Sequence, residues 1–257
     1  MLIASPRHTA ADLRLWSEYH AADLAHGMTI DAKIVRSIAV IRKFAQQPCY
    51  LGVSWGKDSV VAAHLTFSSG VSVPAVWMRI EPIKNPECEI VRDTFLQTWP
   101  LNYSEIERWC EWDRGWHASG TLESAAVEAE QRFGARRILG IRADESGVRR
   151  LTCLRNGEDS ANSCRPLAWW TAQDVMGYLA RFGLPTHPAY AMLGGGRYDR
   201  WRLRVASLGG RRGDGIGRAE WEREYYGDVL RQLQVRLPQG AVRGSTATSA
   251  GTFPGNG

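Results

Sequence analysis

The segment Leu51-Gly52-Val53-Ser54-Trp55-Gly56-Lys57-Asp58-Ser59 carries a short apolar run, typical of a buried strand, directly into the start of a helix. Its small residues let backbone amides turn toward an anion, and the positive end of the helix dipole strengthens that attraction. Lys57 adds a charge, Ser54 and Ser59 add hydroxyl groups, and Gly56 leaves room for a phosphate oxygen. The segment therefore predicts a phosphate-binding loop between a strand and a helix.

Two other interpretations of this segment were compared with the first. A Walker A loop, GxxxxGK[ST], does not fit, because only three residues separate Gly52 from Gly56. In addition, Asp58 occupies the position where that motif has the Ser or Thr that binds Mg²⁺. The remaining alternative is an ordinary strand-to-helix turn in which Asp58 and Ser59 only cap the helix.

Strand-like and helix-like segments alternate on the C-terminal side of this loop. The apolar patterns predict strands over 49–53, 73–80, 101–106 and 137–141, and helices over 58–67, 87–99 and 122–133, the last after a Ser119 or Thr121 cap. Such alternation is typical of an α/β fold, here a three-layer, doubly wound parallel sheet of about five strands with helices on both faces.

The flanking segments complete the expected organisation. A helix capped by Thr9 and ended by Gly27 has Leu13, Trp16 and Leu24 on one side, and a second helix, capped by Thr29, repeats isoleucine from Ile30 to Ile41. A last helix of the nucleotide domain is expected over 171–181. We predict an N-terminal helical segment (1–47), a nucleotide-binding domain (48–195), a basic-aromatic helical extension (196–238) and a disordered tail (239–257).

Composition narrows the class of protein. The 257 residues are 44% hydrophobic, enough for one sizeable core, and no apolar run suggests a membrane helix or a signal peptide, so a cytoplasmic location is expected. The net charge of +5 suits phosphate-bearing partners. Five cysteines without a CxxC pair indicate reduced thiols, with neither a disulfide framework nor an iron-sulfur cluster.

A second polar loop, residues 140–150, follows the fourth predicted strand. In parallel sheets, ligands gather at the carboxyl ends of the strands, so this loop is expected beside residues 54–58. Arg142, Arg149 and Arg150 offer guanidinium donors to phosphate or sulfate, and Glu145 is suited to orient an arginine or to help hold Mg²⁺. The alternative is a solvated charged loop.

Four motifs in order carry a resemblance to a known family. The loop SxGKDS resembles the SGGxDS signature of PP-loop proteins, residues 140–150 match GxRxxES..R, residues 165–179 resemble RPL..WT..DVW.Y, and residues 184–190 resemble lP.nPlY. Over residues 48–195 the chain thus resembles the phosphoadenosine phosphosulfate (PAPS) reductase family, within the adenine nucleotide α-hydrolase-like, Rossmann-like superfamily. The resemblance implies that the chain binds ATP or PAPS, together with Mg²⁺.

The resemblance also implies roles for particular residues. Lys57, Asp58, Arg142, Glu145 and Arg149 are the expected catalytic residues. The adenine is expected near Ile80, where Arg79-Ile80-Glu81-Pro82 replaces an Asp-Thr-Gly-like turn of the family. The full set of expected nucleotide contacts is Val53, Ser54, Trp55, Gly56, Lys57, Asp58, Ser59, Ile80, Gly140, Arg142, Ser146, Arg149 and Arg150.

The chain departs from the family pattern in its cysteines and at Trp55. The redox cysteine of an ECGLH-like motif is missing, and the last cysteine is Cys164. Trp55 replaces a small residue, so only its backbone is expected to face the phosphates. The leading hypothesis is therefore a PP-loop enzyme that splits ATP into AMP and pyrophosphate while it activates an acceptor. One alternative is a thioredoxin-dependent PAPS reductase that uses Cys153, Cys164 or a partner's thiol.

Another alternative is a non-catalytic module that contacts nucleic acid. Arginines interleaved with Tyr198, Trp201 and Trp221 suit phosphate contact and base stacking, although a solvated helix face is a competing interpretation. Related proteins act in sulfur transfer to nucleic acid and occur beside phage or defence genes, so a nucleoprotein partner and a homodimer are also expected. The arginines of this expected interface are Arg197, Arg200, Arg202, Arg204, Arg211 and Arg212.

Overall fold

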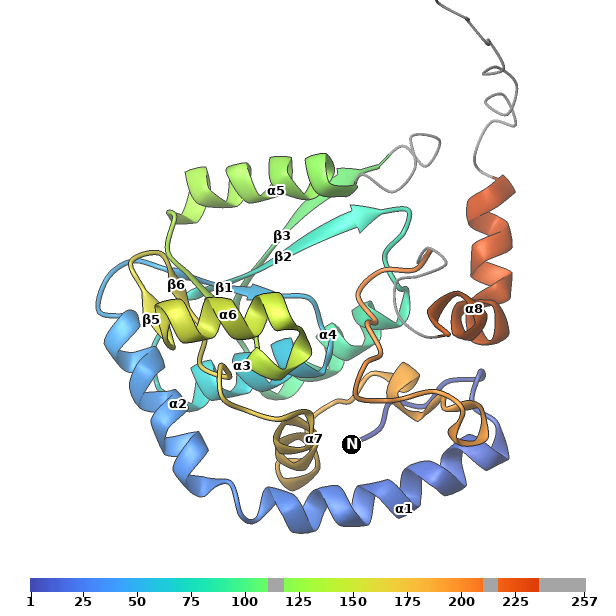
Figure 1. Cartoon of the computed structure of the whole chain (residues 1–257). Coiled ribbons are helices and arrows are strands. Elements are labelled where there is room, and N and C mark those ends of the chain that lie inside the picture. The colour runs from blue at the N-terminus through green and yellow to red at the C-terminus, as the bar shows by residue number, and fades with distance from the viewer. Residues whose placement is uncertain (111–117, 210–216, 236–257) are drawn as a thin grey trace, which may run out of the picture.

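A six-stranded sheet forms the centre of the protein (Figure 1). The computed structural model describes residues 1–110, 118–209 and 217–235. The strand order is β3-β2-β1-β4-β6-β5, and every neighbouring pair is parallel except β5 and β6. The strands are β1 (Tyr50–Val53), β2 (Pro74–Glu81), β3 (Asn102–Trp109), β4 (Arg137–Leu139), β5 (Asp159–Ser160) and β6 (Ser163–Cys164). The α/β class is confirmed, with six strands in place of about five.

Helices cover both faces of the sheet. Figure 1 shows α5 (Ala118–Phe133) on one side and α3 (Lys57–Ser68) and α4 (Glu87–Thr98) on the other, with α7 (Ala172–Arg181) beyond them. Because successive strand residues point to opposite faces, Tyr50 and Val76 pack with α5, whereas Leu51 and Ala75 join the larger core. The strand pattern therefore fills both interfaces.

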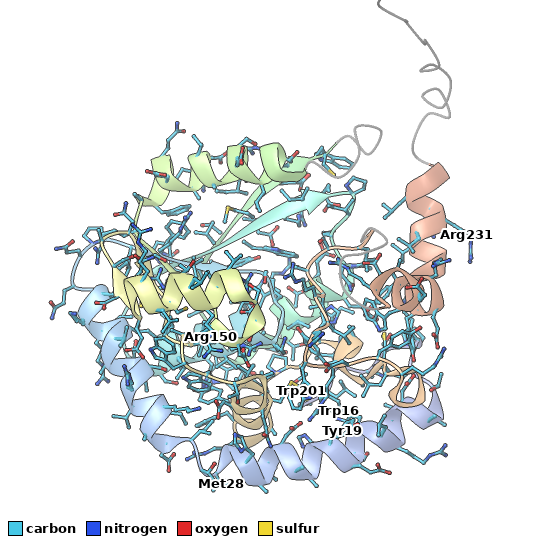
Figure 2. All side chains as sticks on the ribbon, in the orientation of Figure 1. Trp16, Tyr19, Met28, Arg150, Trp201 and Arg231 are labelled. Atoms are coloured by element: carbon cyan, nitrogen blue, oxygen red, sulfur yellow. The ribbon has the colours of Figure 1, made fainter. Side chains whose placement is uncertain are left out.

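The first helix, α1 (Ala10–Gly27), buries a different side from the one expected. Thr9 caps it as predicted, but Leu13 and Leu24 are exposed, and the buried side consists of Trp16 (Figure 2) with two carboxylates, Asp12 and Asp23. The carboxylates are buried because each has fixed partners. Asp12 accepts hydrogen bonds from the amide of Leu193 and from the hydroxyl of Tyr225, among others.

The second helix, α2 (Asp31–Phe44), confirms the isoleucine face. Ile30 and Ile41 are buried, and Ile34 and Ile38 pack against the same core. The expected Thr29 cap is wrong: Ile30 holds the cap position, and the Thr29 hydroxyl donates to the carbonyl of His26.

Three further expectations need correction. Helix α5 begins at Ala118, so Ser119 and Thr121 lie inside it instead of capping it. Residues 147–150, expected as loop, begin helix α6 (Gly147–Asn156), which Ser146 caps. In the part of the basic-aromatic extension that the structure describes, residues 197–209 form an irregular segment and the α-helix is α8 (Arg218–Val235).

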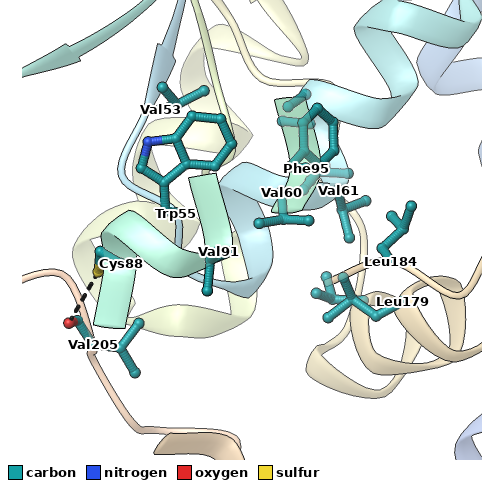
Figure 3. Packing of buried hydrophobic residues seen from close by; sticks show 14 of the residues in the cluster. Val53, Trp55, Val60, Val61, Cys88, Val91, Phe95, Leu179, Leu184 and Val205 are labelled. Carbon is teal, nitrogen blue, oxygen red and sulfur yellow. Dashed lines mark hydrogen bonds between the residues drawn. The ribbon is translucent and has the colours of Figure 1, made fainter. Parts of the chain in front are cut away.

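The larger core joins the N-terminal helices, the sheet and α8. Its buried members include Ile3 and Trp16, residues of the sheet, and Trp221 and Tyr226, and Figure 3 shows the part of it around Trp55 and Phe95. The N-terminal helices and α8 therefore pack on the same core as β1 and α3. None of the helices in the described ranges is long and apolar enough to cross a membrane. The expected disordered tail, 239–257, lies outside the described residues.

Candidate functional site

The two predicted loops meet at the point where the strand order reverses. Strand β1 lies between β2 and β4, so the chain leaves β1 into α3 on one side of a crevice and leaves β4 into residues 140–146 on the other. A cavity of about 920 Å³ opens here. Both loops line it, as the sequence predicted.

Hydrogen bonds within the loop after β1 fix its shape, and two of the described backbone amides that follow it have no acceptor. Ser59 Oγ accepts from the Ser54 amide at 3.2 Å and donates to the Gly56 carbonyl at 3.0 Å, which closes the turn. The Lys57 amide donates to the hydroxyl of Tyr190 at 3.1 Å. Within the described ranges, the amides of Asp58 and Ser59, in the first turn of α3, have no hydrogen-bond acceptor. Such amides at a helix N-terminus suit an anion.

Trp55 shapes this loop through its backbone. Its φ of 60° is left-handed, which is unusual for a residue with a side chain. The indole is fully buried and packs against the rings of Phe95 and Tyr103, each 5.7 Å away between centroids (Figure 3). The Trp55 side chain therefore lies in the core and not in the cavity, and the expectation that its indole would not face the phosphates agrees with this position.

An ion cluster joins the two loops. Asp58 accepts from Arg142 Nε at 2.5 Å and lies 3.2 Å from Lys57 Nζ, while Arg142 also pairs with Asp144. Burial alone would lower the pKa of Lys57, but Asp58 outweighs it and the pKa is raised. Burial would raise the pKa of Asp58, but Lys57 and Arg142 hold it below its usual range. Lys57 and Asp58 are therefore both charged at neutral pH.

Glu145 and Ser146 position the start of α6. Glu145 accepts from the Arg142 amide at 2.9 Å and pairs with the guanidinium of Arg149 through its other oxygen. Ser146 Oγ accepts from the Arg149 amide at 3.2 Å. Burial, and after it the nearby charge of Arg204, lowers the pKa of Arg149. Glu145 therefore orients an arginine, one of the two roles expected for it.

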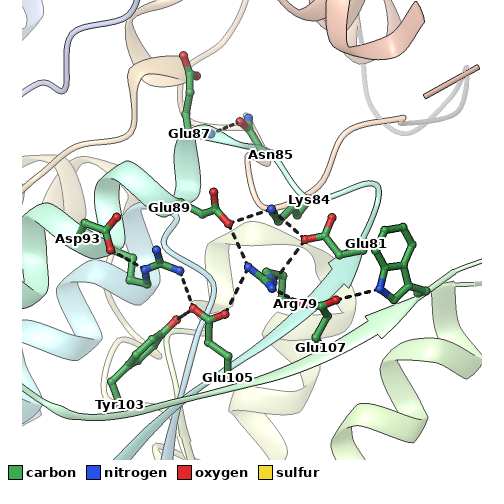
Figure 4. A network of polar contacts seen from close by, with 12 residues as sticks. Arg79, Glu81, Lys84, Asn85, Glu87, Glu89, Asp93, Tyr103, Glu105 and Glu107 are labelled. Carbon is green, nitrogen blue, oxygen red and sulfur yellow. Dashed lines mark hydrogen bonds and ion pairs between the residues drawn. The ribbon is translucent and has the colours of Figure 1, made fainter. Parts of the chain in front are cut away.

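The cavity contains most of the expected residues but not all. Trp55, Ile80 and Arg150 are not part of its lining. Ile80 lies at the end of β2, where the neighbouring Arg79 and Glu81 belong to an ion network with Lys84 and Glu105 (Figure 4). The expected residues that do line the cavity are Val53, Ser54, Gly56, Lys57, Asp58, Ser59, Gly140, Arg142, Glu145, Ser146 and Arg149.

Sequence reasoning missed one wall of the cavity. Tyr190 and the continuous segment Trp201–Ala206 line it next to the loop after β1, since Tyr190 accepts from the Lys57 amide and Val205 lies beside Gly56. Tyr190 belongs to the 184–190 motif, which was recognised in the sequence, but no function was assigned to this residue. Arg202 and Arg204 were predicted as nucleic-acid contacts, and the structure shows that both line this cavity.

The expected nucleic-acid interface is corrected at two of its residues. Arg200 is buried and donates to both oxygens of Asp23, at 2.6 and 2.7 Å. Its guanidinium lies 4.4 Å from the ring centroid of Tyr19 and 4.2 Å from that of Trp201, two residues labelled in Figure 2. Trp221 is buried and donates to the Met192 carbonyl. Neither presents a free face for a strand of nucleic acid. Arg197 is exposed and pairs with Glu224, and Arg211 and Arg212 lie outside the described residues.

No cysteine lines the cavity, although all five fall in the described ranges. Cys153 and Cys164, the two candidates for a relocated thiol, are buried. Burial raises the pKa of Cys153 and raises that of Cys164 to about 12, so both are thiols at neutral pH. Among the described residues there is also no cluster of three or more His, Cys, Asp or Glu side chains arranged to hold a metal ion.

Comparison with known proteins gives distant likenesses only. No protein-family profile and no curated protein matches the chain. Among solved structures, the chain is similar to the PAPS reductase of Candida auris in its phosphate complex, with a TM-score of 0.44, 11% identity, and coverage of 63% of this chain and 88% of that one. It is also similar to NMN synthetase from Francisella tularensis, with a TM-score of 0.41, 13% identity, and coverage of 60% and 71%.

Proposed function

We propose that this chain binds ATP, or a related adenine nucleotide, with its phosphates against the loop formed by residues 54–59, and that it cleaves ATP into AMP and pyrophosphate while activating an acceptor. The observation that carries the proposal is the pair of unused amides, Asp58 and Ser59, which open the first turn of α3 at the sheet's switch point beside the buried cation Lys57.

The charge of the cavity favours a polyanion. Three carboxylates line it, from Asp58, Asp144 and Glu145, against five cations: Lys57, Arg142, Arg149, Arg202 and Arg204. The excess of two positive charges in a concave, partly desolvated space attracts a phosphate chain.

The same cations suit the proposed reaction. When an acceptor oxygen attacks the α-phosphorus of ATP, the new bond joins AMP to the acceptor, the bond from the α-phosphorus to the bridging oxygen breaks, and pyrophosphate leaves with the negative charge. AMP is released when a second nucleophile, such as water, then displaces it from the activated acceptor. Fixed cations near the bridging oxygen lower the barrier, because they are already oriented when the charge develops. Lys57 is fixed by Asp58, and Arg149 by Glu145, which gives both this property.

The carboxylates present fit a magnesium ion shared with the phosphates. Mg²⁺ is usually held by one or two carboxylates together with substrate phosphates rather than by a full protein cage. Asp144 is the most accessible carboxylate of the lining, with 42% of its side chain exposed, and Glu145 follows it in the chain. These two residues would hold the ion, which would neutralise phosphate charge.

The reductase alternative receives less support. It needs a thiolate next to the bound sulfonucleotide, whereas the cysteines of the chain lie outside the cavity lining. A thiol would have to come from another protein. The non-catalytic module likewise loses two of its contact residues, Arg200 and Trp221, to the core.

The test is an incubation of the purified chain with ATP labelled at the α-phosphate, Mg²⁺ and candidate acceptors, with chromatography of the products. We expect AMP and pyrophosphate, and a loss of about 100-fold or more in Lys57→Ala. Lys84→Ala is the matched control. Lys57 is held by one carboxylate, Asp58, and Lys84 by two, Glu81 and Glu89, but Lys84 lies outside the cavity lining. Equal rates in the two variants, or sulfite from PAPS without any AMP from ATP, would contradict the proposal.

A further inference from the structure

Arg204 projects from a segment whose neighbours are firmly held. The Ala206 carbonyl accepts from the Asn85 amide at 3.2 Å, and the Leu208 amide donates to the Ile83 carbonyl at 2.7 Å. These bonds tie the segment 201–208 to the turn between β2 and α4. Its position relative to the cavity is therefore set by backbone bonds.

Val205 fixes the same segment against the core and the phosphate loop. Its side chain is buried, and its carbonyl accepts from Cys88 Sγ at 3.6 Å (Figure 3). A Cβ placed on Gly56 would lie 3.4 Å from a Val205 methyl group, so this residue contacts the loop itself. Arg204, one residue earlier, is consequently held at the cavity wall.

Arg204 and Arg149 line the same cavity from different elements, the segment 201–208 and helix α6. The positive charge of Arg204 contributes, after burial, to the lowered pKa of Arg149. Arg149 has one carboxylate partner, Glu145, and within the described ranges Arg204 has none. Two guanidinium groups facing one space are stabilised by an oxyanion that accepts from both.

We infer that Arg149 and Arg204 form a second oxyanion site, separate from the amides of residues 58–59, which takes a phosphate, sulfate or carboxylate group. The inference rests on the proposed function, because the first site must hold the nucleotide phosphates for this one to be a second. The oxyanion belongs either to the nucleotide itself, as a second phosphate on its ribose, or to the acceptor. The site would make the enzyme selective for substrates that carry an additional acidic group.

Calorimetric titrations separate the two sources. In the first arm, AMP and adenosine 3′,5′-bisphosphate are titrated into the wild type and Arg204→Ala. In the second arm, inorganic phosphate is titrated into both proteins after saturation with α,β-methylene-ATP, which fills the first site and resists cleavage. Arg197→Ala is the control, because Arg197 belongs to the same arginine-rich stretch but pairs with Glu224 at the surface and lies outside the cavity lining.

We expect Arg204→Ala to lose about tenfold or more in affinity in one arm, with Arg197→Ala close to wild type. Loss of the preference for the bisphosphate assigns the oxyanion to the nucleotide, and loss of phosphate binding in the second arm assigns it to the acceptor. If α,β-methylene-ATP binds normally and Arg204→Ala changes neither arm, the second site is refuted while the proposed function stands. If the wild type binds none of the nucleotides, the proposed function itself is contradicted, and the second site with it.

Discussion

Gly140 and Asp58 touch through their backbones. A Cβ built on Gly140 would lie 2.6 Å from the carbonyl oxygen of Asp58, 2.8 Å from its carbonyl carbon and 3.1 Å from the amide nitrogen of Ser59. The end of β4 therefore presses directly on the first turn of α3. This contact fixes the distance between the two loops that line the cavity, and only glycine permits it.

Gly140→Ala should disturb the site more than the fold as a whole. Because the added methyl group meets backbone atoms, either the loop or β4 must shift, at a cost of about 1–3 kcal/mol in the free energy of unfolding. We expect weaker nucleotide binding as well. Urea unfolding and calorimetry measure the two effects. Gly147→Ala is the control, since nothing lies within 4 Å of its Cβ position; if both variants behave alike, the close contact has no consequence.

Trp55 offers a test of backbone strain in the phosphate loop. Removal of the buried indole should cost about 3–5 kcal/mol in Trp55→Ala. Trp55→Gly loses the same packing but relieves the left-handed backbone at φ 60°, which should return about 1 kcal/mol. Thermal and urea unfolding should therefore find the glycine variant more stable than the alanine variant. The reverse order would show that the loop backbone relaxes without cost.

Arg200 should prove to be structural. Arg200→Ala leaves the buried carboxylate of Asp23 without its cation, at a cost of about 3–5 kcal/mol in unfolding free energy. Arg197→Ala removes an exposed arginine with a surface partner, Glu224, and should cost roughly 0–1 kcal/mol. Similar unfolding midpoints for the two variants in urea would disprove the assignment.

Two buried histidines should make stability fall in mild acid. Burial lowers the pKa of His64 to about 4 and that of His187 to about 3, below the usual 6.5. Their folded pKa values are depressed, so the stability they contribute is present above pH 6.5 and is lost as the pH falls toward the folded values. Each should cost roughly 2 kcal/mol by about pH 4.5.

Urea unfolding between pH 7 and pH 4.5 measures this loss. His64→Gln should flatten the dependence, since glutamine does not titrate and retains a polar group for the hydroxyl of Tyr178, which His64 contacts at 2.8 Å. An unchanged slope in the variant would mean that His64 is accessible to protons in the folded state.

The parts of the fold with a clear apolar period were predictable, and those whose burial depends on tertiary partners were not. The four strands and the α3 and α4 helices followed from local pattern. Helix α6 was not predicted, because it lacks a buried apolar face. Its apolar residues Val148, Leu151 and Leu154 face solvent, and Cys153 is its buried residue. In α1, Trp16 is buried as expected, but the carboxylates Asp12 and Asp23 are buried where Leu13 and Leu24 were expected.

The site was predictable where one contiguous segment builds it. Residues 53–59 and 140–149 supply two walls of the cavity, and sequence motifs predicted both segments as parts of the site. The wall at 201–206 was not predictable as part of the site, because its place depends on backbone bonds to residues 83 and 85, more than 100 positions away in the sequence. The charges at Arg202 and Arg204 were noted from the sequence, but their place in this cavity was not predicted.

The most direct test of the central claim is the position of the nucleotide in a crystal of this chain grown with α,β-methylene-ATP. We predict phosphate oxygens within hydrogen-bond distance of the Asp58 and Ser59 amides, with Lys57 alongside. A nucleotide seated elsewhere, or an empty loop at saturating concentration, would contradict it.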